Sequence, residues 1–148
     1  IMATTTASIT LSSSDLLTDN LSLSSTMNLY QNGTTATGLE QVNYHRLVIP
    51  TGTQFDLIAE SAALSEDASY VYIINKNTDV TDYVLIDINS EEIGRLYAGD
   101  WMFIPWDCDL TAANVDSSIE IEAVGHETII EYALFHNGET LPTAADAD

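Results

Sequence analysis

The sequence predicts an all-β fold, an antiparallel β-sandwich or jelly roll with an extended N-terminal arm. Three observations lead to this prediction. Short segments rich in Val, Ile, Tyr and Phe recur at regular spacing, turn residues separate them, and the signal for helix is weak. Only residues 110–115 are expected to form a short helical turn. At 148 residues, the chain has the length of one domain.

The dense core is predicted in residues 41–137. Turn residues such as Gly52, Asn89 and Gly99 separate its apolar segments. Isoleucine and glutamate alternate in residues 119–122, as in a strand with one face in the core. Residues 70–74 and 83–86 are apolar on both faces, which predicts central strands covered on both sides or strands at a subunit contact. The candidate strands are residues 43–49, 54–60, 69–76, 82–88, 92–97, 101–106, 118–124 and 128–136.

Residues 1–40 are rich in Ser and Thr and are predicted to form an N-terminal arm with one or two edge strands. Residues 21–24 alternate as in a half-buried strand, and residues 31–38 read as a loop. The leucines are too sparse for a core and too many for a solvated tail. We therefore expect them to pack on the same domain's sheet edge or, preferably, on a neighbouring subunit. Residues 138–148 form a short acidic tail, and the N-terminus lacks a signal-peptide pattern, so we expect it to be unprocessed.

The charge is the most unusual property of the chain. Twenty-three acidic and three basic residues give a formal net charge of −20. This charge repels phosphate backbones and anionic lipid heads, so we expect neither nucleic acid nor a membrane as a partner. It also indicates an environment in which salt screens the repulsion.

Residues with catalytic potential are scattered along the chain. His45, His126 and His136 are far apart, and we expect them on the surface or on edge strands rather than in a metal site. Cys108 is the single cysteine, so no intrachain disulfide can form. We find no nucleophile elbow and no phosphate-binding glycine loop. The sequence therefore predicts a protein that is not an enzyme and has no cofactor.

Two pairs of aspartates have the spacing of oxygen ligands for a hard cation. They are Asp79 with Asp82 and Asp107 with Asp109. Neither pair belongs to a complete calcium loop, so we interpret both as solvated faces and predict no metal. Asp107 and Asp109 also disfavour the thiolate of Cys108, for which we expect an inert role. A glycosidase-type acid pair between distant residues stays open.

Aromatic and leucine side chains are the main candidates for an interface. Trp101 and Trp106 have odd spacing, so they lie on opposite faces of one strand and one of them faces away from the core. Tyr70 and Tyr72 share a face. Aromatic residues are enriched at protein interfaces, although packing in the core is the commoner role. The predicted interface residues are Leu11, Leu16, Leu17, Leu21, Leu23, Leu29, Tyr30, Trp101 and Trp106.

The segment GDWMFIP at residues 99–105 resembles the opening of the second motif of the cupins, a jelly-roll family. The resemblance implies a tight turn at Gly99 followed by a core strand ending at Pro105. The family's motif continues with a glycine and a metal-binding histidine, where this chain has Asp107 and Leu110, and the chain has no His-x-His pair. The resemblance therefore extends to the turn and strand and not to the metal chemistry.

The segments YVYIINKN (residues 70–77) and EIGRLYAGDWMFIP (residues 92–105) resemble small virion proteins of tailed bacteriophages, of the capsid decoration and head- or tail-associated types. The resemblance implies a structural protein of the virion, with other capsid or tail proteins and its own copies as partners. Two alternatives are a carbohydrate- or calcium-dependent binding module of lectin type and a small metal-independent jelly-roll enzyme such as an isomerase. The first alternative predicts a shallow aromatic groove near aspartate pairs, and the second a deep pocket with a perturbed acid or histidine.

Overall fold

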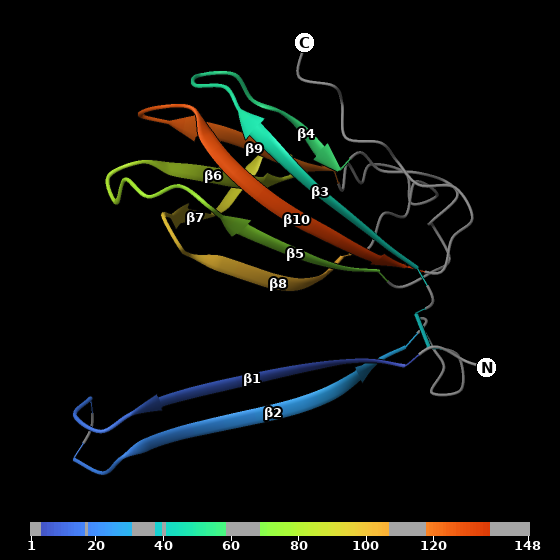
Figure 1. Ribbon diagram of the computed structural model, residues 1–148, viewed down its shortest axis with the longest axis vertical. Helices are drawn as coiled ribbons and strands as arrows, with labels where there is room; N and C mark the ends of the chain where they lie inside the picture. Colours follow the sequence, from blue (N-terminus) through green and yellow to red (C-terminus); the bar gives the residue numbers. More distant parts are fainter. Residues whose placement is uncertain are drawn as a thin grey trace.

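A computed structural model describes residues 4–16, 18–30, 38–39, 41–58, 69–106 and 118–136, and the described chain is built from strands alone (Figure 1). No described segment is a helix long and apolar enough to cross a bilayer. The strands are β1 (Thr5–Ser13), β2 (Leu21–Leu29), β3 (Gln41–Ile49), β4 (Phe55–Ile58), β5 (Ser69–Asn75), β6 (Tyr83–Ile88), β7 (Glu91–Tyr97), β8 (Trp101–Trp106), β9 (Ile119–Val124) and β10 (Thr128–His136).

Strands β3 to β10 form two four-stranded antiparallel sheets with the orders β3-β10-β5-β8 and β4-β9-β6-β7. Most successive strands change sheet, and this order is the topology of an eight-stranded jelly roll. The prediction of an all-β antiparallel sandwich or jelly roll is thus confirmed. The predicted strands at 101–106 and 128–136 have the observed bounds, and the others differ at their ends by one or two described residues. The predicted helical turn at 110–115 and the tail at 138–148 lie outside the described residues.

The core lies between the two sheets and is built from alternate residues of each strand. Val71 and Ile73 of β5 face Ile86 of β6 and Ile121 of β9 in one buried cluster. Hydrophobic burial of this kind is the main favourable term in folding. The turn between β6 and β7 has two residues, Asn89 and Ser90, both with positive φ, which is the conformation that matches the twist of a two-residue hairpin.

The two sheets differ in the chemistry of their outer faces. On sheet β4-β9-β6-β7, Glu120 and Glu122 of β9 alternate with buried isoleucines, and Glu120 lies opposite Asp87 of β6 in the ladder. Gln54 donates hydrogen bonds to both Asp87 and Glu120. This face carries several carboxylates, whereas the outer face of the other sheet is apolar, as described below.

Strands β1 and β2 form a separate antiparallel hairpin that lies beside the outer face of β5 and β8 (Figure 1). The alternation at residues 21–24 correctly indicated β2, and β1 was not located from the sequence. The hairpin is amphipathic. One face carries Ser, Thr and Asn, with cross-strand hydrogen bonds such as Ser8 to Thr26, and the other carries the larger apolar side chains.

Two predictions about histidines and aspartates need correction. His136 was expected on the surface or on an edge strand, but it is buried and lies in β10, an inner strand of its sheet. The alternation of β10 places it on the core side with Tyr132 and Leu134. Asp82 was interpreted as part of a solvated face, but only 3% of its surface is exposed.

Candidate interaction surface

The outer face of sheet β3-β10-β5-β8 is apolar across all four strands. Residues that alternate with the core residues point outward here, and the strand register places them side by side. We call this set of residues the outer face. It consists of Val42, Tyr44, Arg46 and Val48 of β3, Ile129, Glu131, Ala133 and Phe135 of β10, Tyr70, Tyr72 and Ile74 of β5, and Trp101, Phe103 and Pro105 of β8.

Aromatic rings on β5 and β8 stack across the two strands. The rings of Tyr70 and Phe103 have centroids 5.5 Å apart and are inclined by 7°. Those of Tyr72 and Trp101 are 6.3 Å apart and inclined by 37°. These contacts join residues that are diagonal neighbours in the ladder, which is within reach of large side chains. The result is an ordered aromatic surface rather than single exposed rings.

Arg46 and Glu131 are the only residues of the outer face with ionic side chains. Arg46 Nη1 lies 3.6 Å from Glu131 Oε1, and the hydroxyl of Tyr44 donates a hydrogen bond to Oε2 of the same glutamate. This hydrogen bond raises the pKa of Tyr44, so its hydroxyl stays protonated. The charges of the pair cancel, and the outer face is neutral on a chain of net charge −20.

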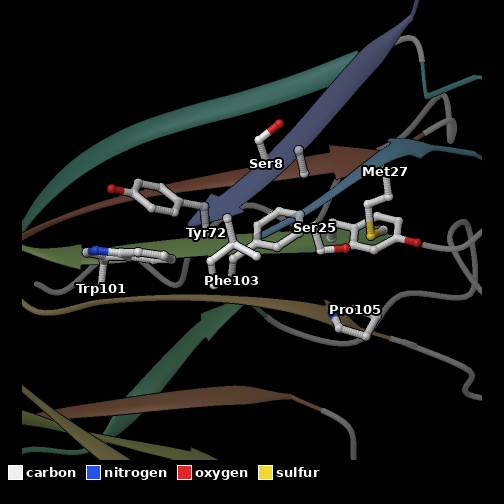
Figure 2. A pocket seen from close by; sticks show the side chains of 10 residues that line it. Ser8, Ser25, Met27, Tyr72, Trp101, Phe103 and Pro105 are labelled. Carbon is white, nitrogen blue, oxygen red and sulfur yellow. The ribbon is translucent and has the colours of Figure 1, made fainter. Parts of the chain in front are cut away.

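An open groove of about 690 Å³ lies between the hairpin and the outer face (Figure 2). Met27 extends from the hairpin toward the rings of β5 and β8. On the hairpin, Ile9, Leu11, Leu23 and Met27 still expose 43–54% of their surface, so the two apolar surfaces are not packed together. The groove is lined by Ala7, Ser8, Ile9, Ser25, Met27, Tyr70, Tyr72, Trp101, Phe103 and Pro105.

The lining of the groove suits binding and not acid–base chemistry. The described residues that line it carry no carboxylate, imidazole, thiol or amine, and their polar groups are hydroxyls, the indole N–H of Trp101 and the backbone. Such a surface can bury aliphatic or aromatic side chains of a partner. A general acid or base would have to come from elsewhere in the chain.

The structure brings together only part of the predicted interface. Trp101 lies at the groove and is 50% exposed, whereas Trp106 is 4% exposed and packs in the core. This confirms the prediction that the two tryptophans face opposite ways and corrects the assignment of Trp106 to an interface. Leu29 is buried as well, next to Leu39, whose backbone N–H donates to the Leu29 carbonyl.

The other predicted residues that the structure describes belong to the hairpin or directly follow it. Leu11, Leu16 and Leu23 are exposed, Leu21 is half-buried, and Tyr30 forms an isolated bridge with Gly38. Leu17 lies outside the described residues. Sequence reasoning missed several groove residues, among them Ile9, Met27, Phe103 and Pro105. Phe103 and Pro105 could have been identified from the sequence, because they alternate with the intervening residues in the same way as Trp101 and so lie on its face of the strand.

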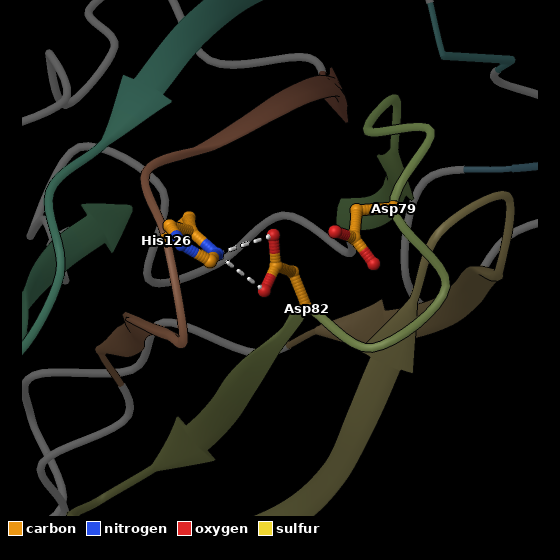
Figure 3. A group of neighbouring side chains, drawn as sticks. All are labelled: Asp79, Asp82 and His126. Carbon is orange, nitrogen blue, oxygen red and sulfur yellow. Dashed lines mark hydrogen bonds and ion pairs between the residues drawn. The ribbon is translucent and has the colours of Figure 1, made fainter.

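A second group of functional side chains lies at the end of the sandwich, where Asp79, Asp82 and His126 meet (Figure 3). Their possible ligand atoms lie within 4.8 Å of one another. His126 Nδ1 is 3.0 Å from Oδ1 and 3.2 Å from Oδ2 of Asp82. A carboxylate only accepts, so Nδ1 carries the proton. Gly125 has φ +99° and lies directly against Asp82, so that a Cβ there would overlap Oδ1.

The two exposed members of this group have shifted pKa values. The hydrogen bond to Asp82 raises the pKa of His126 above its ordinary 6.5. The backbone N–H and hydroxyl of Thr81 donate to Asp79 and lower the pKa of that carboxyl. The group could offer three ligands to a metal ion, but the contact with His126 already occupies the Asp82 carboxylate.

The raised pKa of His126 gives a pH prediction. A histidine whose pKa is higher in the folded chain than in the unfolded chain stabilises the fold. This stabilisation is fully present at pH values below the pKa of the unfolded chain, and it is lost as pH rises through the pKa of the folded chain. We expect the His126 ring to titrate above pH 6.5 in NMR spectra. Asp82→Asn should move the midpoint back toward 6.5, and Asp79→Asn should move it less. A midpoint below 6.5 in the unmodified chain would contradict the hydrogen bond.

A chelator should leave the fold unchanged. Calcium requires six to eight oxygen ligands, and among the described residues two carboxylates and one imidazole meet here. We expect the melting temperature measured by circular dichroism to be the same with EDTA and with added calcium. A decrease of several degrees in EDTA would show that a cation is bound and would favour a calcium-dependent module.

Comparison of the chain with protein-family models and with curated proteins found no match.

Proposed function

We propose that this chain is a structural virion protein, which binds a capsid or tail lattice and its own copies and has no catalytic role. The observation that supports this proposal best is the neutral outer face, flanked by an amphipathic hairpin that leaves the groove open. The likeness of residues 70–77 and 92–105 to phage virion proteins agrees with it. Jelly rolls occur in viral capsids, lectins and cupins, so the fold alone does not choose among these functions.

The distribution of charge explains how such a protein would assemble. The outer face of sheet β4-β9-β6-β7 carries Glu120, Glu122 and Asp87 and remains in water. The outer face of the other sheet is neutral, so it approaches another surface without repulsion. Burial of its rings would then supply the affinity, at about 25 cal/mol per Å² of apolar surface. The acidic face keeps the assembled particle soluble.

The runner-up is a carbohydrate-binding module. The stacked pair Tyr72 and Trp101 favours it, since sugar rings bind on aromatic surfaces of this kind. Sugar recognition also needs polar groups that fix orientation, and the described lining offers few of them. They are the hydroxyls of Ser25, Tyr70 and Tyr72 and the indole N–H of Trp101, whereas the Ser8 hydroxyl bonds Thr26 on the other face of the hairpin. A glycan array probed with the labelled chain separates the two functions, because the virion proposal expects no glycan to bind.

The proposal is tested on virus particles purified from the source of the sequence. Mass spectrometry should find this chain at a fixed ratio to the major shell protein. Particles stripped of the chain should rebind the recombinant protein but not Trp101→Asp/Phe103→Asp. The matched control is Leu85→Asp/Val124→Asp, which adds the same charge to the opposite sheet and should still bind. If purified particles lack the chain, the proposal is wrong.

Salt should strengthen any association between copies. Raising ionic strength from about 10 mM to 1 M shortens the Debye length from about 30 Å to about 3 Å. Copies that each carry −20 then repel one another less, so we expect the mass measured by light scattering to rise with salt. A mass that is constant over this range would contradict the expectation that charge opposes assembly.

A further inference from the structure

We infer that the hairpin of one copy docks its apolar face on the outer face of a second copy. This inference rests on the proposed function, and it identifies a second copy of the chain as the partner of the outer face. A two-stranded hairpin is marginally stable alone in water, and this one has free edges on both strands. Its apolar side chains are about half exposed, so no described part of the same chain makes the contact that would stabilise it.

The outer face is wider than the hairpin. The hairpin is two strands wide and lies over β5 and β8, whose residues supply the sheet side of the groove. The half formed by β3 and β10 is left open, and Val42, Tyr44 and Val48 remain 53–58% exposed there. A single hairpin cannot cover four strands, so apolar surface of β3 and β10 stays open in one chain. The apolar face of the hairpin is turned to its own β5 and β8 across the groove, so docking on a second copy requires the hairpin to turn away from its own sheet.

The described part of the hairpin matches the open half of the outer face in length. Within the described residues, β1 and β2 have nine residues each, and so do β3 and β10, whereas seven are described for β5 and six for β8. The open half of the outer face is therefore as long as the hairpin. Face-to-face packing of two antiparallel pairs is the ordinary way in which sheets bury apolar surface.

The charge of the chain favours a second copy as the partner of these two surfaces. Two copies of a chain with net charge −20 can meet closely only where both surfaces are neutral. On the described hairpin the acids are Asp15 and Asp19, both at its turn, and its strands carry none. The outer face has one compensated pair, Arg46 with Glu131. A basic partner would be drawn instead to the acidic sheet, so a second copy fits this pair of surfaces better.

The experiment traps the contact as a disulfide between two chains. Cys108 is replaced with Ser in both, and a size-tagged chain with Ile9→Cys is produced in one cell with an untagged chain with Tyr44→Cys. Ile9 and Tyr44 are central in β1 and β3. After mild oxidation, a non-reducing gel should show a mixed dimer. The matched control is Thr10→Cys on the polar face of β1, which should give at least about tenfold less.

The outcomes separate this inference from the proposed function. Equal yields from Ile9→Cys and Thr10→Cys, or an oligomer that gives no mixed dimer, overturn the docking of the hairpin. So does a chain with Ile9→Cys and Phe103→Cys that links only within itself, because its hairpin then closes on its own sheet. A chain that is monomeric at every salt concentration also overturns the inference. The function fails separately, if purified particles lack the chain.

Discussion

Replacing Ile86 with Ala is expected to lower the free energy of unfolding by about 2–5 kcal/mol. Ile86 lies in β6, a strand with neighbours on both sides, and its side chain is completely buried in the core cluster. The truncation removes apolar contacts and leaves a cavity that close-packed neighbours such as Ile121 and Val84 cannot fill. Unfolding in urea, followed by circular dichroism, gives the change.

The matched control for Ile86 is Val80→Ala. Val80 is exposed and lies in the loop before β6, so its truncation should change the free energy of unfolding by less than about 0.5 kcal/mol. A loss below about 1 kcal/mol for Ile86→Ala would mean that the core is loosely packed. It would also contradict the placement of β6 at the centre of the sandwich.

The strands of the sandwich were predictable because their signals are local. Alternation in residues 119–122 and the turns at Asn89 and Gly99 depend on neighbours in the chain, and the structure places β9, β6–β7 and β7–β8 accordingly. Strand β1 gave a weaker signal, since Ile9 and Leu11 are its large apolar residues among Ser and Thr. Its role becomes evident only when its register with β2 is known.

The candidate surface was predictable only in part because it depends on strand pairing. Parity placed Tyr70 and Tyr72 on one face and separated Trp101 from Trp106. It could not show that β5 pairs with β8, or that the hairpin lies opposite both. The contact between Asp82 and His126 spans 44 residues and was missed for the same reason. The sequence did not determine whether Trp101 or Trp106 is buried, because either face of a strand can be the core face.

Removing the hairpin should abolish assembly and leave a folded domain. The core cluster contains no residue from β1 or β2, so deletion of residues 2–30 removes none of its side chains. Each leucine buried in a contact contributes about 1.5–3 kcal/mol, less the entropy of ordering it. With several such residues, we expect association to weaken at least about 100-fold. Sedimentation in high salt measures this, and circular dichroism checks the fold.

A double substitution tests the same surface without shortening the chain. Leu11→Asp/Leu23→Asp places two charges on the apolar face of the hairpin, and Thr10→Asp/Ser24→Asp places two on the polar face. Both pairs are directly opposite in the ladder, so both add the same charge and the same cross-strand repulsion. Only the first pair should prevent association, because only its charges would have to be buried.

If the chain that lacks residues 2–30 unfolds, the hairpin belongs to its own core and does not link copies. If both double variants assemble equally well, the apolar face of the hairpin is not the contact.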